Sequence, residues 1–155
     1  MTSITIRPVD SRDIEDLTGV VAETGLFPPE MLADLIDPHL TGQEDCLWLL
    51  AITEGKIAGF CYGRAEHLTD GCWNMLALGV ASADRRHGIA RRLATALETM
   101  LAASGVRLLI VNTSGSADFA AARRFYEAAG YAREASIRDY WAEGDDKITF
   151  RKSLG

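Results

Sequence analysis

Residues 85–91 of this 155-residue chain read Arg85-Arg-His-Gly-Ile-Ala-Arg91, and they stand between an apolar, strand-like run and an amphipathic helical pattern. Where a loop leads from a strand into a helix, unpaired backbone N–H groups and the positive end of the helix dipole converge, which favours anions. Gly88 would let the backbone approach a phosphate with no Cβ atom in the way, and the arginines add positive charge. The segment therefore predicts a phosphate-binding loop.

On charge alone, a solvated basic helix start is an equal alternative for residues 85–91. The strand-loop-helix context favours the binding loop over it. The sequence has no G-x-x-x-x-G-K-[ST] run and no G-x-G-x-x-G after a strand. Neither the Walker loop nor the usual dinucleotide fingerprint is therefore present, and a phosphate loop of another kind remains.

The hydrophobic periodicity outside the loop predicts one mixed α/β domain over residues 1–155. Strands are expected at 4–7, 46–53, 56–64, 73–80, 106–111, 131–137 and 147–152; helices are expected after Asp10, from Pro28-Pro29 to Pro38, from Gly88 to Gly105 and up to Gly130. Strand 106–111 reads as buried on both faces, and the last two strands are separated by a loop rich in Asp, Glu and Gly. A central sheet of about seven strands flanked by about four helices follows.

Composition excludes several classes of protein. The formal net charge of −6 argues against a nucleic-acid-binding protein, and no apolar run is long enough to span a membrane. The three cysteines, Cys46, Cys61 and Cys72, show neither a disulfide framework nor a zinc-binding spacing, so no metal is expected. A cytoplasmic protein with no export signal is the expectation.

Two motifs resemble those of the GNAT superfamily of N-acetyltransferases. The run Val80-x4-Arg85-x-x-Gly88-Ile89-Ala90 is similar to its acyl-CoA loop, [RQ]-x-x-G-x-[GA], and Ala122-x3-Tyr126-x3-Gly130-Tyr131 is similar to its second signature. The resemblance covers the whole chain and implies a GNAT-like fold. It also implies an enzyme that moves an acetyl group from acetyl-CoA to a primary amine of a small molecule or peptide.

The resemblance also implies roles for particular residues. Leu78 and Val80 would offer backbone groups to the acetyl carbonyl and the pantetheine arm of acetyl-CoA. The pyrophosphate would be surrounded by Arg86, His87, Gly88, Ile89, Ala90 and Arg91. Tyr126 matches the family's general acid, which returns a proton to the departing thiolate, although helical spacing alone would make it a core aromatic.

The general base is left open. Related enzymes often have a Glu on the strand that residues 106–113 represent, but Asn112 stands at the matching position and cannot act as a base. The Asn that family members often have near the cofactor is replaced here by Phe119. Asp118 or Asn112 could take the place of that Asn. Weaker candidates are the acidic residues near turns, whose ordinary role is solvated loop charge: Glu66, Asp70, Asp139, Glu143, Asp145 and Asp146.

Two other functions compete with acetyl transfer. The missing Glu leaves open a module that binds acyl-CoA as a sensor without turnover. A helix-turn-helix DNA binder over residues 85–105 is disfavoured by the net charge and by the apolar strand that follows. The acceptor amine and the formation of a homodimer are not determined by the sequence.

Overall fold

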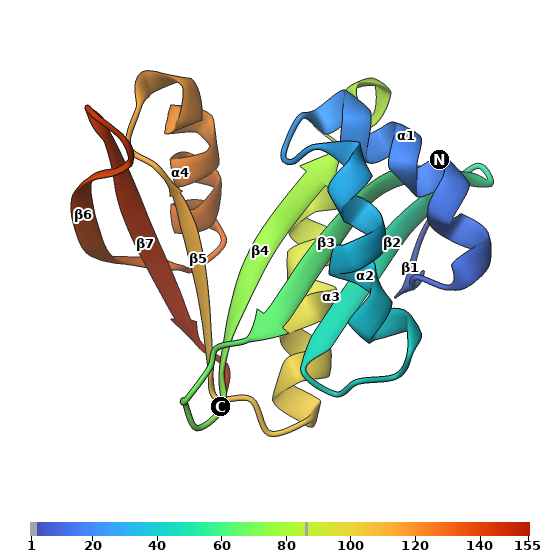
Figure 1. The fold of residues 1–155 in the computed structure, drawn as a ribbon, viewed down its shortest axis with the longest axis horizontal. Coiled ribbons are helices and arrows are strands. Elements are labelled where there is room, and N and C mark those ends of the chain that lie inside the picture. The colour runs from blue at the N-terminus through green and yellow to red at the C-terminus, as the bar shows by residue number, and fades with distance from the viewer. Residues whose placement is uncertain (1–2, 86) are drawn as a thin grey trace.

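The chain folds around one seven-stranded sheet, as a computed structural model describing residues 3–85 and 87–155 shows (Figure 1). The strands are β1 (Ile4–Pro8), β2 (Cys46–Thr53), β3 (Lys56–Ala65), β4 (Cys72–Val80), β5 (Leu108–Ser114), β6 (Ala132–Ala142) and β7 (Asp145–Ser153). Their order in the sheet is β1-β2-β3-β4-β5-β7-β6, and only β4 and β5 run parallel. The expected mixed α/β architecture is confirmed.

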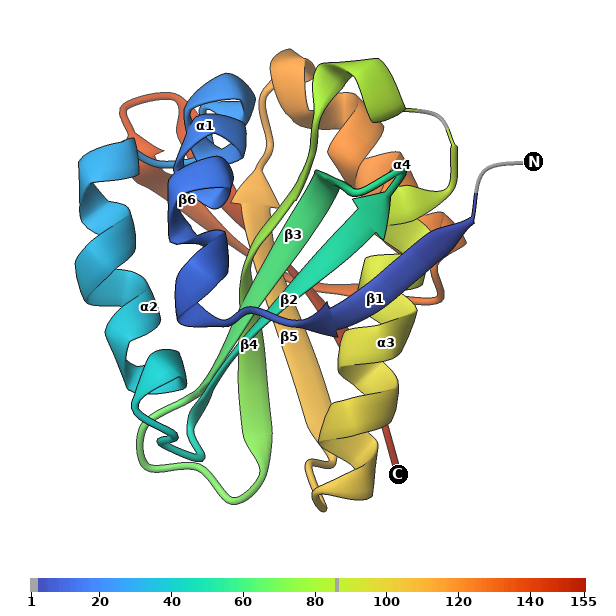
Figure 2. The same cartoon turned by 90° about the vertical axis from the view of Figure 1, so that its right-hand side faces the viewer.

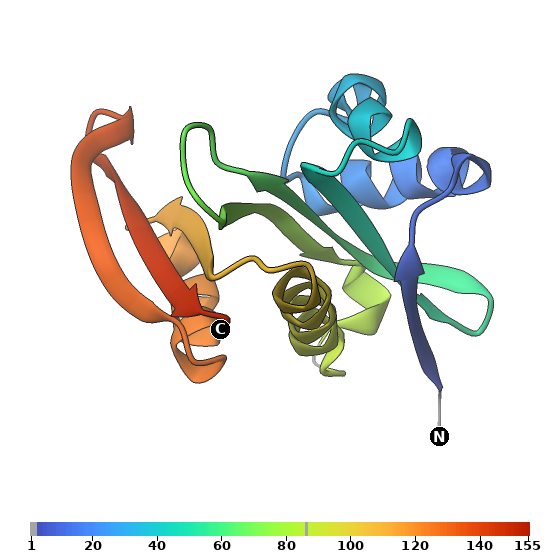
Figure 3. The ribbon, with the colours of Figure 1, turned by 90° about the horizontal axis from the view of Figure 1, so that it is seen from below.

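Helices cover both faces of the sheet. Those described are α1 (Ile14–Thr24), α2 (Leu32–Leu40), α3 (Ile89–Ala103) and α4 (Ala120–Ala128). Figures 2 and 3 show α1 and α2 on one face and α3 on the other. Alternation along β2 explains both layers, since Leu49 and Ala51 pack in the core under α3 while Trp48 and Leu50 pack under α1 and α2.

Three expected boundaries were wrong. Pro38 does not end the second helix, because α2 continues to Leu40 and only the one backbone bond that Pro cannot donate is lost. The strand expected at 106–111 lies at Leu108–Ser114, and its residues alternate between buried and half-buried instead of being buried on both faces. The loop expected between residues 137 and 147 is mostly strand, because β6 and β7 extend to a turn at Glu143 and Gly144.

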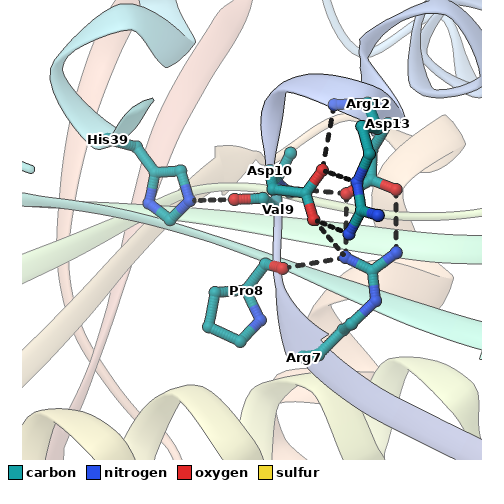
Figure 4. Close-up of polar contacts among 7 residues, drawn as sticks. All are labelled: Arg7, Pro8, Val9, Asp10, Arg12, Asp13 and His39. Atoms are coloured by element: carbon teal, nitrogen blue, oxygen red, sulfur yellow. Dashed lines mark hydrogen bonds and ion pairs between the residues drawn. The ribbon is translucent and has the colours of Figure 1, made fainter. Parts of the chain in front are cut away.

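The junction between β1 and α1 is fixed by polar contacts (Figure 4). Asp10 caps the first turn by accepting the backbone N–H of Arg12 at 2.9 Å, and Asp13 accepts the backbone N–H of Asp10 at 2.8 Å. Arg7 donates two bonds of 2.8 Å to Asp13. These contacts lower the pKa of Asp13, mainly through the hydrogen bond from Arg7, so the stability they provide is lost as the pH falls through that lowered pKa.

His39 joins α2 to the two strands beside it. Its Nδ1 accepts the backbone N–H of Trp48 at 3.1 Å, so the ring proton is on Nε2, which lies 2.8 Å from the carbonyl oxygen of Val9 and donates to it. Figure 4 shows the second contact. His39 thus has a structural role.

Helix α3 lies close against β3 because a glycine faces it. A Cβ atom on Gly59 would lie 2.8 Å from the carbonyl oxygen of Gly79 and 3.1 Å from a methyl group of Leu93 on α3. We expect Gly59→Ala to lower the free energy of unfolding by about 1–3 kcal/mol through overpacking. Gly19→Ala is the control, because Gly19 is exposed in α1 with nothing near its Cβ position, and should raise stability by about 0.5–1 kcal/mol.

Denaturant unfolding measures both variants. Equal stability changes in the two variants would contradict close packing at Gly59.

Candidate active site

The two parallel strands separate soon after they meet, and this opens the centre of the sheet. The pairing of β4 with β5 is limited to Cys72–Asn74 against Leu108–Ile110. The next residues of β4 contain a bulge, because Ala77 and Met75 face consecutive residues of β3 and Leu76 is extra. A bulge bends and twists its strand, which accounts for the divergence of β4 from β5 in Figure 1.

The separation leaves backbone N–H groups of β4 without a strand partner. Ala81 donates its N–H to Ala58 of β3 at 2.8 Å. Because N–H directions alternate along a strand, the N–H groups of Leu78 and Val80 point away from β3 and into the opening. Both residues expected to offer backbone donors therefore stand at the open edge.

The N-terminus of α3 lies at the end of this opening. Gly88 is its N-cap residue with φ of 76°, and no side chain caps the helix. The first intrahelical bond is donated by Arg92 to the carbonyl of Gly88, so the preceding N–H groups lack helical acceptors. With no acidic residue in the first turn, the positive end of the helix dipole is not neutralised locally.

A cleft of about 750 Å³ lies in front of this helix end. Its lining includes Val80, Asp84, Arg85, Gly88, Ile89, Ala90, Arg91, Asp118, Ala121, Ala122 and Phe125. The loop motif and the second signature, separate in sequence, thus form opposite walls of one cleft. His87, expected among the pyrophosphate contacts, is exposed and lines a different hollow of about 330 Å³ beside Thr53 and Glu54.

The arginine side chains of the loop are turned toward backbone carbonyls. Arg91 donates to the carbonyl of Ala128 at the end of α4, and Arg92 donates to the carbonyl of Ile4. Arg85 makes a long contact of 3.4 Å with the carbonyl of Val80. Arg86, which was also expected near the pyrophosphate, lies outside the described residues.

A second cleft of about 350 Å³ lies next to the first, and Ala122 lines both. It lies between β4 and β5 and is lined by Leu26, Met75, Leu76, Ala77, Leu78, Val111, Asn112, Thr113, Ser114, Phe119, Ala122, Tyr126, Trp141 and Asp145. An extended molecule could therefore pass from the helix N-terminus along the open edge of β4 to Tyr126.

Tyr126 combines the two roles that the sequence left in competition. Its ring packs within 5.3–5.8 Å of the rings of Phe125, Tyr131 and Phe150. Its side chain also lines the second cleft, and its hydroxyl donates to no acceptor among the described residues. Burial raises the pKa of Tyr126 to about 12, so the phenol stays protonated at neutral pH.

Asn112, at the position of the family's usual base, and the acidic candidates differ in position. Asn112 lines the second cleft and accepts a hydrogen bond of 2.7 Å from Thr149, while the exposed Asp118 lines the first. Glu66 lies at the other end of the meander, where it accepts a bond from Asn74. The nearby Asp70 is exposed, and its carbonyl accepts a bond from Arg107, so both turn residues are away from the clefts.

The acidic residues of the last hairpin also differ in whether they line a cleft. Asp139 accepts the N–H of Gly144 within its own turn, and Asp146 accepts the N–H of Asp139. Glu143 is not among the described residues that line the two clefts. Asp145, by contrast, lines the second cleft close to Ser114, whose hydroxyl donates to it.

Sequence reasoning missed part of the walls of the second cleft. Trp141 and the bulged Leu76 gave no signal, because a bulge depends on pairing and Trp141 fell in an expected loop. The described residues contain no group of three His, Cys, Asp or Glu side chains placed to hold a metal ion. No described helix has the length and apolar character needed to cross a membrane.

Comparison with known proteins agrees with this geometry. Residues 14–131 match the model of the acetyltransferase (GNAT) family. A protein from Desulfovibrio desulfuricans assigned to the GNAT family has 27% identity and a TM-score of 0.89, with full coverage of both chains. Among proteins with curated functions, no sequence matches the chain.

Two further solved structures share the fold. The ribosomal-protein-S18-alanine N-acetyltransferase of Escherichia coli has 21% identity and a TM-score of 0.82, covering 99% of this chain and 95% of its own. The PaiA N-acetyltransferase of Thermoplasma acidophilum, solved with coenzyme A, has 19% identity and a TM-score of 0.77, covering 97% of this chain and 99% of its own.

The chain belongs to the GNAT acetyltransferase family. It is an N-acetyltransferase that uses acetyl-CoA as its co-substrate, as the family does. The residues fit that co-substrate on a structural ground, because an uncapped helix N-terminus and an unpaired strand edge supply donors for a pyrophosphate and for an amide-containing arm.

Proposed function

We propose that this enzyme transfers the acetyl group of acetyl-CoA to a primary amine of a small molecule or peptide by direct attack. The observation that carries the proposal is the pair of clefts that share Ala122, one at the N-terminus of α3 and the other between β4 and β5 at Tyr126. In this assignment Gly88, Ile89, Ala90 and Arg91 present backbone N–H groups to the pyrophosphate. Arg86 is assigned to the same neighbourhood from the sequence motif alone, whereas His87 lines the adjacent hollow and is not assigned to the pyrophosphate.

Leu78 and Val80 are the proposed donors along the strand. Their N–H groups would bind the thioester carbonyl and the pantetheine amides, whose orientation then follows the strand. As negative charge develops on the carbonyl oxygen during attack, a fixed backbone donor stabilises it without reorganisation. This role uses the backbone N–H groups and does not depend on the side chain at either position.

Tyr126 is the proposed acid. A free thiol has a pKa near 8.5, so complete transfer of a proton from a phenol of pKa about 12 to a thiolate in water would be unfavourable. The thiolate would leave inside the same apolar cleft, where desolvation raises its basicity as well and narrows the difference. Tyr126 thus donates a hydrogen bond to the sulfur as the carbon–sulfur bond breaks, and its proton passes to the thiolate. The protons that the attacking nitrogen loses go to water, and water returns one proton to Tyr126.

The test is release of free thiol from acetyl-CoA with a panel of primary amines. Thiol release that depends on the amine, with one acetylated product per thiol, is the expected result. Acetyl-CoA binding by calorimetry runs beside it, because tight binding with no thiol release across the panel would favour the competing function of an acyl-CoA sensor.

A further inference from the structure

Large exposed apolar side chains gather around the second cleft. Four of the ten large hydrophobic residues exposed among those described line it: Leu26, Leu76, Phe119 and Trp141 are 45%, 50%, 43% and 48% exposed. They come from the α1–α2 connection, the β4 bulge, the turn before α4 and the end of β6. Contiguous exposed apolar surface around a cleft is typical of a binding site for an apolar group.

This apolar wall is held in place. The indole N–H of Trp141 donates to the carbonyl of Thr113 on β5 at 3.3 Å, which fixes the ring across the end of the cleft. On the opposite side, Leu26 lies against Gly79, where a Cβ atom would come within 3.0 Å of its methyl group. Rigid apolar walls lose little conformational entropy when a ligand binds between them.

Among the residues that the structure describes, one acidic side chain lines this cleft. Asp145 is half-buried, and the hydroxyl of Ser114 donates to its Oδ1. Ser114 is itself fixed, because its oxygen accepts the N–H of Ser116 at 3.0 Å. Asp145 forms no ion pair within residues 3–85 and 87–155, and its Oδ2 accepts no hydrogen bond there.

Arg123, which binds the backbone of Ser114, forms no ion pair with this carboxylate. Arg123 donates two bonds of 2.7 Å to the carbonyls of Ser114 and Ser116, which leaves it directed at the backbone of the loop. Lys147, two residues along β7, stacks on the ring of Tyr140 at 4.1 Å. The carboxylate is thus positioned but lacks a cation among the residues that the structure describes.

We infer that the acceptor is a monocationic amine carrying an apolar or aromatic group, and that Asp145 recognises its ammonium. This inference rests on the proposed acetyl transfer and names the class of acceptor for that reaction. The apolar group lies between Trp141, Phe119 and Leu26, and the ammonium donates to Oδ2 of Asp145 on binding. Because the same nitrogen is the nucleophile, it loses one proton to water and leaves the ion pair before it attacks the thioester. A polyamine would bury a second charge against apolar side chains, and an amino dicarboxylate would face Asp145 with like charge.

Calorimetry in the presence of coenzyme A tests the recognition with matched ligands. Phenethylamine is the cationic aromatic probe, phenethyl alcohol is its uncharged analogue, and spermidine and glutamate are the polycationic and anionic probes. We expect phenethylamine to bind at least about tenfold more tightly than the other three, since each of them lacks either the ammonium or the apolar group that the cleft accommodates. Equal or tighter binding of spermidine, or no binding of phenethylamine, would overturn the inference.

The variant Asp145→Asn isolates the charge, since its amide oxygen can still accept from Ser114. It should weaken phenethylamine about tenfold, leave phenethyl alcohol unchanged and leave acetyl-CoA affinity unchanged. In turnover assays, KM for phenethylamine should rise with kcat nearly constant, and Asp145→Glu should restore part of the loss. A fall in kcat at constant KM would overturn the recognition role, because the carboxylate would then act on the proton.

Asp146→Asn is the matched control, with the same loss of charge one residue away and outside the cleft. It should leave KM for phenethylamine unchanged. An equal rise in KM in both variants would mean that the loss of one negative charge near the cleft explains the effect, and it would overturn the inference. Binding and turnover separate the two proposals. If phenethylamine binds through Asp145 but no thiol is released, the proposed acetyl transfer is overturned and the recognition site is supported. If spermidine is the one probe that is acetylated, acetyl transfer is supported and the inferred recognition is overturned.

Discussion

Tyr126→Phe is expected to lower turnover about a hundredfold or more, with acetyl-CoA affinity and melting temperature nearly unchanged. Phe keeps the ring that packs against Phe125, Tyr131 and Phe150 and removes only the hydroxyl. That hydroxyl donates to no described acceptor, so its removal leaves no buried partner unsatisfied. Steady-state thiol release, calorimetry and thermal unfolding measure the three quantities.

Tyr131→Phe is the control for this substitution. Its hydroxyl donates to Glu98 at 2.7 Å, and Glu98 also accepts a bond of 2.8 Å from Lys152. Its removal should cost about 1–2 kcal/mol of stability while turnover is retained, which is the opposite pattern. Unaltered turnover in Tyr126→Phe would mean that water protonates the thiolate and that Tyr126 is only a core residue.

Gly88→Glu is expected to abolish measurable acetyl-CoA binding, which we place at about a hundredfold loss or more. A carboxylate at the first turn of α3 would neutralise the helix end and repel a pyrophosphate. The position is open, with no atom near a new Cβ, but its φ of 76° adds strain of about 1 kcal/mol for a residue other than glycine. Calorimetry with acetyl-CoA measures the affinity, and circular dichroism verifies folding.

Gly105→Glu separates the charge at the helix start from the backbone strain. Gly105 follows the other end of α3, has φ of 86° and likewise has open space at its Cβ position. It therefore has the same strain and the same added charge, but it should retain acetyl-CoA affinity. If both variants lose affinity equally, or if Gly88→Glu binds normally while folded, the N-terminus of α3 is not the phosphate site.

Local signals were sufficient to predict most of the fold. Only Glu54 and Gly55 separate the strands expected at 46–53 and 56–64; both have positive φ, which glycine favours, and a two-residue turn of this kind forms the β2–β3 hairpin. Gly88 and Gly105 likewise predicted the ends of α3. The failures were nonlocal, since the extension of β6 depends on pairing with β7, and Pro38 is tolerated within a helix that β2 supports.

In the candidate site, too, the local features could be predicted from the sequence and the nonlocal ones could not. The loop at Gly88 and the signature at Tyr126 are each contiguous in sequence. Their roles could therefore be predicted before the structure showed that they lie close together. Asp145 lies at the cleft only because β7 pairs with β5, and Trp141 lies there only because β6 pairs with β7. No spacing in the sequence could separate Asp145 from its neighbour Asp146, which faces its own hairpin.

The short parallel pairing of β4 and β5 provides an internal reporter. Amide hydrogens of a central strand normally exchange slowly with solvent, but those of Leu78 and Val80 have no strand partner and should exchange quickly in the free enzyme. Acetyl-CoA should slow both, while Gly79, which faces β3, keeps its protection throughout. NMR-detected exchange of these adjacent amides would therefore read occupancy of the cleft residue by residue, with no acceptor needed. Unchanged exchange at Leu78 and Val80 in saturating acetyl-CoA would place the pantetheine arm elsewhere.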